Sequence, residues 1–467
     1  MTLTVRNPAT GEAIETIETP GPDEIARRAA RAEAAQRGWA ATPLPERAAA
    51  IERFAAHVEA QREPLAQLLS RETGKPIRQA RAELAGLAPR FRWFLERSPA
   101  VLAEQVLETD EASGTEQRLR WEPLGVVANI SAWNYPWFVG VNVFVPALLA
   151  GNAVLYKPSE FATLTGREIA RGMRQAGIAE DVFAFVPGGG AAGEALLAPP
   201  VRAVYFTGSY RTGRRVNERA AAHLMRVQLE LGGKDPLYVT EDVSIGWAAR
   251  AAAEGAMYNA GQSCCAVERI YVHEAIYPRF SEALVAEVER LRVGDPLDEA
   301  TDVGPLCRPA QLEVLEAQVR DALEQGARLG CGGARLPGPG AYFAPTVLLD
   351  CHHGMQVMTE ESFGPVIGLE PVANDEEALE RMRDTHYGLT AAVFGADRER
   401  AQRILSQIET GTAYWNCCDR VSACLPWSGR RHSGIGATLG DEGIRAFAAP
   451  RAWHLRRPPM PREEAQP

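Results

Sequence analysis

VVANISAWNYPWFVGVNVFVPALLAGNAVLYK, residues 126–157, is the stretch that decides the fold class of this chain. Its ends, VVANI and AVLYK, are short β-rich runs, and the apolar segment between them is long enough for a helix. The runs VFAFV and AVYFTG follow the same rhythm, each with a turn and a helical stretch behind it. Strand, crossover helix and strand repeated in this way predict a parallel sheet and therefore an α/β fold.

The same stretch also has to be considered as a membrane span, because no charged residue lies between Pro123 and Tyr156. However, Pro136 and Pro146 interrupt it, and asparagines are spread along its length. Irregular backbone exposed to lipid is poorly tolerated inside a membrane. A buried strand, loop, helix and strand therefore fits the pattern better than a membrane helix.

The flanking segments predict the rest of the architecture. Residues 22–105 have helical spacing, and the polar, alternating segment 108–122 is typical of an exposed hairpin strand. After Gly232 the α/β rhythm restarts and predicts a second unit. Its expected elements are helices at 244–259 and 277–292 and strands at 270–273, 391–395 and 412–416.

Length and charge set limits on function. The chain has 467 residues and a formal net charge of −10. At roughly 100–200 residues per domain, this length predicts about two to four domains. The acidic balance argues against nucleic acid or an anionic membrane as a partner, because both favour clustered Lys and Arg. The first residues, MTLTVRNPATGEAIE, lack the apolar core of a signal peptide, which favours a cytoplasmic location.

The cysteines and histidines give no sign of a metal site. None of the eight cysteines precedes Cys264, and no CxxC pair is present, so we expect free thiols in a reducing compartment. The pair His352-His353 has no HExxH motif beside it and fits a solvated turn. The stretch GQSCCAVER, Gly261–Arg269, sets two cysteines side by side, and a lone cysteine there would more often be a buried, inert thiol.

Two glycine-rich loops follow predicted strands. Gly188, Gly190 and Gly193 match G-x-G-x-x-G, yet no acidic residue stands about 20 positions further on. This loop either cradles a pyrophosphate or is a glycine turn that opens a helix, and the missing acid favours the turn. In the second loop a β-run ends in Gly208-Ser209 with Gly213 beyond, so that backbone N–H groups at a helix start can face an anion.

Six short motifs occur along the chain in a fixed order. They are WNYP (133–136), KPSE (157–160), FTGS (206–209), LELGGK (229–234), GQSC (261–264) and ESFGP (361–365). In this order and spacing they resemble the NAD(P)-dependent aldehyde dehydrogenase superfamily. The similarity runs from Asn7 to the SGIG stretch at Ser433, which is nearly the whole chain.

This resemblance implies an aldehyde dehydrogenase-like fold with a Rossmann-type cofactor domain, an α/β catalytic domain and a small β oligomerisation extension. It also implies a homodimer or homotetramer, because the exposed hairpin pairs with a partner subunit in such proteins and a strand within 451–457 completes its sheet. The implied divisions are 1–107 with 126–231 for the cofactor, 232–441 for catalysis, and 108–125 with 446–458 for the extension.

The resemblance selects Cys264, and not Cys265, as the nucleophile. A thiolate adds to an aldehyde carbonyl and gives a thiohemiacetal whose oxyanion can expel hydride, and the resulting thioester can be hydrolysed. The implied oxyanion donors are the side-chain amide of Asn134 and the backbone N–H of Cys264. The implied general base is Glu230, whose pKa an apolar site would raise.

The sequence departs from the family pattern at two positions. Some members have a lysine in the helix after the Asn motif and a carboxylate near the C-terminal glycine-rich turn, proposed to relay protons from the base. Val143 and Thr438 stand at these positions here, so the route of the proton from Glu230 is open. Two rival functions remain: a coenzyme A-acylating enzyme, against which Glu230 argues, and a non-catalytic cofactor-binding protein, against which the intact catalytic set argues.

The implied cofactor is NAD, with NADP less favoured. The Glu160 carboxylate can accept from two ribose hydroxyls and would repel a 2′-phosphate. The cofactor-binding residues implied by the resemblance are Ser131, Trp133, Lys157, Ser159, Glu160, Gly188, Gly208, Ser209, Gly213, Gly232, Glu361 and Phe363.

The resemblance also places Tyr135, Cys265, Arg420 and Trp427 along the aldehyde tunnel. The flat apolar side chains of Tyr135 and Trp427 favour an aromatic or medium-chain aldehyde. Arg420 would instead suit the carboxylate of a semialdehyde, although an arginine in a polar loop is more often simply solvated. The sequence therefore predicts the reaction but leaves the identity of the aldehyde open.

Overall fold

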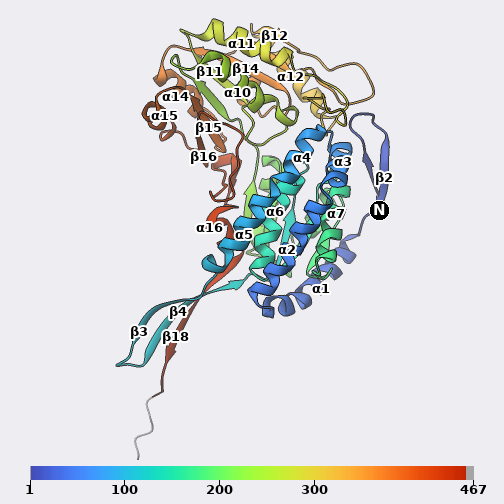
Figure 1. Ribbon diagram of the computed structural model, residues 1–467, viewed down its shortest axis with the longest axis vertical. Coiled ribbons are helices and arrows are strands. Elements are labelled where there is room, and N and C mark those ends of the chain that lie inside the picture. Colours follow the sequence, from blue (N-terminus) through green and yellow to red (C-terminus); the bar gives the residue numbers. More distant parts are fainter. Residues whose placement is uncertain (1, 459–467) are drawn as a thin grey trace, which may run out of the picture.

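The computed structural model describes residues 2–458; Met1 and residues 459–467 lie outside the described residues. Two lobes, each built on a mainly parallel sheet, lie one above the other in Figure 1, and a narrow β-extension projects from the lower lobe. A short hairpin at the N-terminus, β1 (Thr2–Arg6) with β2 (Ala13–Glu18), lies along one side. The predicted α/β class is confirmed.

The lower lobe contains a six-stranded sheet in the order β17-β9-β8-β5-β6-β7, in which only β17 is antiparallel. The predicted strands VVANI, AVLYK, VFAFV and AVYFTG all belong to this sheet. The strands are β5 (Val126–Ile130), β6 (Ala153–Lys157), β7 (Phe183–Phe185), β8 (Val201–Thr207), β9 (Arg226–Glu230) and β17 (Gly434–Ile435).

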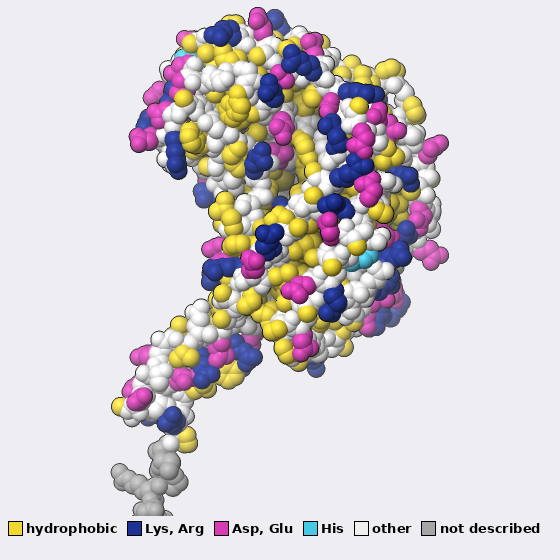
Figure 2. Space-filling view, in the orientation of Figure 1, with side chains coloured by type: hydrophobic (Ala, Val, Ile, Leu, Met, Phe, Trp, Pro, Cys, Tyr) yellow, Lys and Arg dark blue, Asp and Glu magenta, His cyan; other side chains and the backbone are white. Residues whose placement is uncertain are grey.

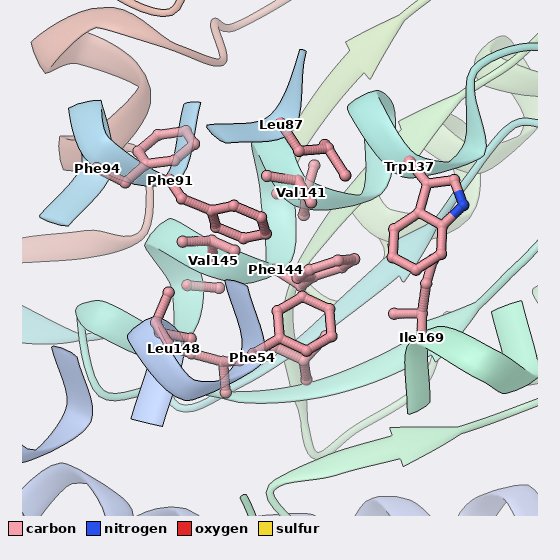
Figure 3. Packing of buried hydrophobic residues seen from close by; sticks show 14 of the residues in the cluster. Phe54, Leu87, Phe91, Phe94, Trp137, Val141, Phe144, Val145, Leu148 and Ile169 are labelled. Carbon is pink, nitrogen blue, oxygen red and sulfur yellow. The ribbon is translucent and has the colours of Figure 1, made fainter. Parts of the chain in front are cut away.

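Helices cover both faces of this sheet because the strand side chains alternate. Val127 and Tyr156 pack into one apolar cluster with α2–α7, whereas Ala128 and Leu155 pack into another with α1, α8 and α9. Figure 3 shows the first cluster, where the ring of Phe54 meets those of Phe91 and Phe144 edge-on at 5.8 and 6.2 Å. The helices are α1 (Pro22–Ala41), α2 (Leu44–Ala60), α3 (Arg62–Thr73), α4 (Ile77–Ala85), α5 (Leu87–Val101), α6 (Pro136–Leu149), α7 (Thr163–Gln175), α8 (Gly190–Ala195) and α9 (Tyr210–Ala221).

The stretch 126–157 forms β5, α6 and β6, which are almost wholly buried, so the predicted buried strand–helix–strand unit is confirmed. Helix α6 begins at Pro136, which favours a first helical turn, and has only 14 residues. Within residues 2–458, none of the helices combines the length and the hydropathy that crossing a bilayer requires.

The upper lobe contains a seven-stranded sheet in the order β12-β13-β14-β11-β10-β15-β16, in which β12 alone is antiparallel. Helices α10 and α11 cover one face, and α12–α15 cover the other. The expected helices and strands after Gly232 are confirmed. The strands are β10 (Pro236–Val239), β11 (Arg269–His273), β12 (Arg328–Cys331), β13 (Thr346–Leu349), β14 (Val366–Val372), β15 (Thr390–Phe394) and β16 (Thr412–Trp415), and the helices are α10 (Ile245–Met257), α11 (Tyr277–Glu289), α12 (Gln311–Glu324), α13 (Gln356–Thr359), α14 (Asp375–Arg383) and α15 (Arg398–Leu405).

The β-extension is a three-stranded antiparallel sheet in the order β18-β4-β3. It consists of β3 (Gln105–Asp110), β4 (Thr115–Pro123) and β18 (Ala448–Arg456), so the predicted exposed hairpin and C-terminal strand both exist. Every residue of β3 is exposed, which leaves the outer edge of that strand uncovered within the described chain.

After β16 the chain returns to the lower lobe. Strand β17 pairs with β9, and α16 (Gly440–Arg445) packs against α5. This return brings Thr438 next to Glu230. The domain division stays a prediction, and we note that residues 434–441, assigned there to catalysis, contact the cofactor sheet.

Candidate active site

A strained turn carries the chain from α10 to the two adjacent cysteines. Asn259, Ala260 and Gly261 have positive φ angles of 53°, 55° and 69°. A Cβ atom at Gly261 would lie 2.2 Å from the carbonyl oxygen of Gly364, so this position requires glycine. Left-handed residues in series are costly and are maintained where the site needs them. The turn therefore fixes the direction of the chain between the end of α10 and Cys264.

The two cysteines have different surroundings. Cys264 is half-buried and lines a cavity of about 790 Å³ between the lobes, on the hollowed face that Figure 2 shows. Cys265 is buried, and its Sγ lies 3.0 Å from Oδ1 of Asp419, which also accepts from Ser263 Oγ at 2.8 Å. The hydrogen bond with Cys264, burial and the Asp419 carboxylate raise the pKa of Cys265 well above its usual value, so this thiol stays protonated at neutral pH.

Asn134 is held rigidly at the same cavity, between the end of β5 and the start of α6. Its Nδ2 donates to the carbonyl oxygen of Gln262 at 3.1 Å, and Asn259 Nδ2 donates to the Asn134 carbonyl at 3.3 Å. Gln262 is itself fixed, because its Oε1 accepts from the backbone N–H of Cys307 at 2.9 Å. The second hydrogen of the Asn134 amide has no acceptor among residues 2–458, so it can be donated to a substrate oxygen.

Glu230 ends β9 and is buried at the wall of the cavity. Its Oε1 accepts from Gln228 Nε2 at 2.6 Å and from Thr438 Oγ1 at 3.2 Å, and its Oε2 has no partner among the described residues. Burial raises the pKa of Glu230 to about 8, against smaller lowering effects of these hydrogen bonds. The carboxyl group is therefore mostly protonated at neutral pH and titrates close to it.

Residues at the carboxyl ends of β5 and β6 come together as parallel-strand topology requires. The Ser131 N–H donates to the Lys157 carbonyl at 2.9 Å, while the buried Ser131 Oγ has no partner within residues 2–458. Lys157 Nζ lies 3.9 Å from Glu160 Oε2 and donates to the Pro158 carbonyl at 3.0 Å. Burial lowers the pKa of Lys157. Ser159, which lies between Lys157 and Glu160 in the sequence, is also buried.

The two glycine loops end at different helices. Ser209 is the N-cap of the 12-residue α9, and a Cβ at Gly213 would lie 2.5 Å from Leu231, so glycine is needed where α9 packs. Gly208 precedes this cap at the end of β8. Gly188 has a φ of 146° and precedes α8, a helix of only 6 residues. Both loops lead into the N-terminus of a helix, and the roles predicted for them stay predictions.

The ESFGP motif, residues 361–365 of the upper lobe, contacts the glycine pair that follows β9. Glu361 Oε1 accepts from the N–H of Gly233 at 3.1 Å, and a Cβ at Gly232 would lie 2.3 Å from that oxygen. Burial, with a smaller contribution from Glu268, raises the pKa of Glu361 to about 8. Phe363 has a positive φ of 46°, and its ring meets Trp133 edge-on at 5.6 Å.

All four residues predicted for the aldehyde tunnel line the cavity: Tyr135, Cys265, Arg420 and Trp427. Arg420 is exposed. Two of the aromatic side chains on the cavity wall are in contact with cations of the chain itself, whereas Trp247 and Tyr258 also line the cavity. Lys75 Nζ lies 3.8 Å from the ring centroid of Tyr135, and the Arg90 guanidinium lies 3.8 Å from that of Phe138.

Sequence reasoning missed several residues of this site. Gln228 and Asn259 were not singled out, and no local motif marks either of them. Arg90 was missed as well, although a signal existed. It stands between Leu87 and Phe94 in the buried stripe of α5, where an arginine interrupts an otherwise apolar pattern.

Within residues 2–458 there is no cluster of three or more His, Cys, Asp or Glu side chains suited to a metal ion. All eight cysteines are free thiols. The chemistry that these side chains offer is therefore that of a nucleophilic sulfur, an amide donor and a carboxyl group of raised pKa around one cavity.

Comparison with known proteins gives matches over nearly the full length. A model described as the aldehyde dehydrogenase family matches residues 1–452. A betaine aldehyde dehydrogenase of Cereibacter sphaeroides is 37% identical over 442 residues, covering 94% of this chain and 91% of the relative. An E. coli NADP-dependent enzyme superposes with a TM-score of 0.95 at 30% identity, covering 98% of this chain and 95% of that one. A Staphylococcus aureus betaine aldehyde dehydrogenase in complex with NAD+ superposes with a TM-score of 0.94 at 29% identity. The match covers 100% of this chain and 94% of that one.

Proposed function

The chain belongs to the aldehyde dehydrogenase family and oxidises an aldehyde with a nicotinamide dinucleotide, and we propose that Cys264 is its nucleophile, Asn134 its oxyanion donor and Glu230 its general base. The observation that supports this assignment most strongly is their convergence. Three side chains from separate elements line one cavity, although they are far apart in the sequence. The product is a free carboxylic acid.

In the first half of the reaction the Cys264 thiolate bonds to the carbonyl carbon, and the negative charge moves to the carbonyl oxygen. The fixed amide of Asn134 and the backbone N–H of Cys264 donate to this oxygen as its charge develops. Losing one such donor typically costs about 3–4 kcal/mol of barrier. A bound dinucleotide would supply the acceptor for the hydride that leaves this carbon, and the acyl group would then remain on Cys264 as a thioester.

In the second half Glu230 takes a proton from a water molecule whose oxygen bonds to the thioester carbon. The carbon–sulfur bond then breaks, and Cys264 leaves as the thiolate while the carboxylic acid forms. Glu230 has to be ionised for this step, and its pKa of about 8 allows that near neutral pH. Gln228 and Thr438 hold the carboxyl group in its resting position.

The residues at the crevice fit a dinucleotide. Ser131 has a buried hydroxyl without a partner in the described chain, and Ser209 stands at the N-cap position of α9, where backbone N–H groups can receive an anion. We propose NAD in preference to NADP because the Glu160 carboxylate would repel a 2′-phosphate. Trp133, Phe363 and the carboxyl group of Glu361 would hold the remaining part of the cofactor.

The substrate in the relatives' names, betaine aldehyde, carries a fixed positive charge. Aromatic faces bind such groups, and five aromatic side chains line this cavity, but Lys75 and Arg90 already lie over Tyr135 and Phe138, and the Arg90 charge would repel a second cation. We therefore propose a substrate without a positive charge, with an aromatic or medium-length chain that a cavity of about 790 Å³ can hold.

We also propose that the protein acts as a homodimer or homotetramer in the cytoplasm. The β-extension projects from the body of the subunit, and the open edge of β3 is suited to pairing with a second copy. The eight free thiols are suited to a reducing compartment.

The test of the reaction is NADH formation with a panel of aldehydes, run in parallel with NADP and with and without coenzyme A. We expect NAD reduction and release of free acid without coenzyme A. Cys264→Ser should abolish the steady rate, because an alcohol is a far weaker nucleophile than a thiolate at this position. Cys331→Ser, in β12 and away from the cavity, is the matched control and should retain it. An active Cys264→Ser enzyme would refute the assignment.

A further inference from the structure

The buried face of helix α5 contains one charged side chain. Leu87, Phe91 and Phe94 on this face point into the core, as Figure 3 shows, and Arg90 lies in the same stripe. Arg90 is only 6% exposed and lines the cavity that Cys264 also lines. A buried charge is costly unless it is paired or has a ligand to bind. The surroundings of Arg90 therefore need an explanation.

Every partner of the Arg90 guanidinium in the structure is neutral. Its Nε donates to Asn142 Oδ1 at 3.2 Å, its Nη1 to the Gly86 carbonyl at 3.3 Å, and its Nη2 to the Val421 carbonyl at 3.5 Å. A guanidinium has five N–H groups, so two remain without an acceptor. Within residues 2–458 no carboxylate forms an ion pair with Arg90. Burial lowers the pKa of Arg90 to about 10, which still leaves it cationic at neutral pH.

The carboxylates around the same cavity are already engaged elsewhere. Glu83 pairs with the buried Lys75 and accepts the N–H of Trp137 at 3.0 Å. Asp419 accepts from Ser263 and Cys265, and Glu230 is mostly protonated at neutral pH. Glu254 is exposed. None of these carboxylates forms an ion pair with Arg90, so the wall is positively charged at this residue. Asp419, which also has only neutral partners, remains a separate anion beside the two cysteines.

We propose that Arg90 is a specificity-determining residue that binds a carboxylate at the far end of the aldehyde, so that the preferred substrates are ω-carboxy aldehydes, or semialdehydes. This inference rests on the proposed function, because it concerns the chain attached to the carbonyl that Cys264 attacks. A guanidinium forms two parallel hydrogen bonds with a carboxylate, which fixes its orientation as well as its position. Arg90 is favoured over Arg420 for this role because Arg420 is exposed to water, where an ion pair contributes little.

The alternative is a purely structural role, in which Arg90 only connects α5 to α6 and to the loop at Val421. The stack on Phe138 and the bond to Asn142 support that role too. The two roles make different predictions. A purely structural arginine affects stability and all substrates alike, whereas a carboxylate-binding arginine changes the KM of anionic aldehydes and leaves that of neutral ones.

The experiment uses linear aldehydes of equal length, from four to eight carbons, whose far end is a carboxylate, a carboxamide or a trimethylammonium group. NADH formation gives kcat and KM for the wild type, Arg90→Met and Arg90→Lys, with Arg92→Met on the exposed side of α5 as the matched control. We expect the wild type to prefer the carboxylate by about 10- to 100-fold in kcat/KM, as hydrogen bonds to charged groups imply. Arg90→Met should remove this preference through KM, Arg90→Lys should reduce it, and Arg92→Met should keep it.

Each outcome decides the matter. A wild type that handles carboxamide or trimethylammonium aldehydes as well as the carboxylate, or an Arg90→Met enzyme that keeps the preference, would overturn the proposal. If Arg90→Met does not fold, Arg90→Lys decides instead, since an unchanged preference contradicts the role and a reduced one supports it. Absence of turnover with every aldehyde would refute the proposed function. Turnover of neutral aldehydes without a preference for the carboxylate would refute only the role of Arg90.

Discussion

At the scale of single residues, the partners of Glu230 set the pH dependence of turnover. Burial raises the pKa of Glu230 to about 8, and the hydrogen bond from Thr438 lowers it. Only the ionised form is a base, so hydrolysis should accelerate as pH rises through about 8. In Thr438→Val the lost hydrogen bond should move this rise upward by about 0.4–1 pH unit. The measurement is kcat against pH, and an unmoved profile would show that Thr438 does not bear on the base.

Asp419 has a related effect on the second cysteine. Its carboxylate helps to raise the pKa of Cys265 and orients the chain on both sides of Cys264. Asp419 has a φ of 47°, a conformation that asparagine tolerates, so Asp419→Asn removes the charge with little backbone cost. We expect Cys265 to become more reactive in this variant. Mass spectrometry after iodoacetamide treatment should find Cys264 alkylated in the wild type and both thiols in Asp419→Asn; identical labelling would contradict this.

At the scale of elements, the turn before Cys264 should be the most sensitive. Gly261→Ala would place Cβ 2.2 Å from the Gly364 carbonyl and keep a φ of 69° that costs about 1–2 kcal/mol for an L-residue. We expect a loss of at least that much unfolding free energy in urea, together with a lower kcat. Gly246→Ala in α10, where a Cβ meets nothing within 4 Å, is the control and should be neutral or stabilising. Equal urea midpoints of unfolding for the two variants would show that the turn accommodates the added Cβ atom without loss of stability.

The elements also show where sequence reasoning ends. The strands of residues 126–157 were predictable because two short β-rich runs flank an apolar segment of helical length. Strands β9 and β10 escaped prediction because they enclose a glycine-rich motif, which interrupts the strand pattern between them. The motifs predicted Cys264, Asn134 and Glu230, since each lies in a local pattern, and all three line the cavity. Gln228 and Arg90 reach the site only through tertiary packing, and their spacing along the chain does not predict these contacts.

At the scale of the whole molecule, the β-extension should determine assembly. Val106 and Leu107 on β3 are 56% and 64% exposed, beside the unpaired backbone of an edge strand. A charge on this edge disfavours pairing between copies, so Leu107→Glu should shift the enzyme to a smaller species in sedimentation velocity. Because β3 lies outside both lobes, the thermal unfolding of each subunit should change little.

The matched control for assembly is Val314→Glu. Val314 lies on α12 and is 41% exposed, so the new charge is comparable but far from the extension. It should leave the sedimentation coefficient unchanged. If Leu107→Glu also sediments as the wild type, copies of the chain associate through another surface, and the open edge of β3 has a different partner.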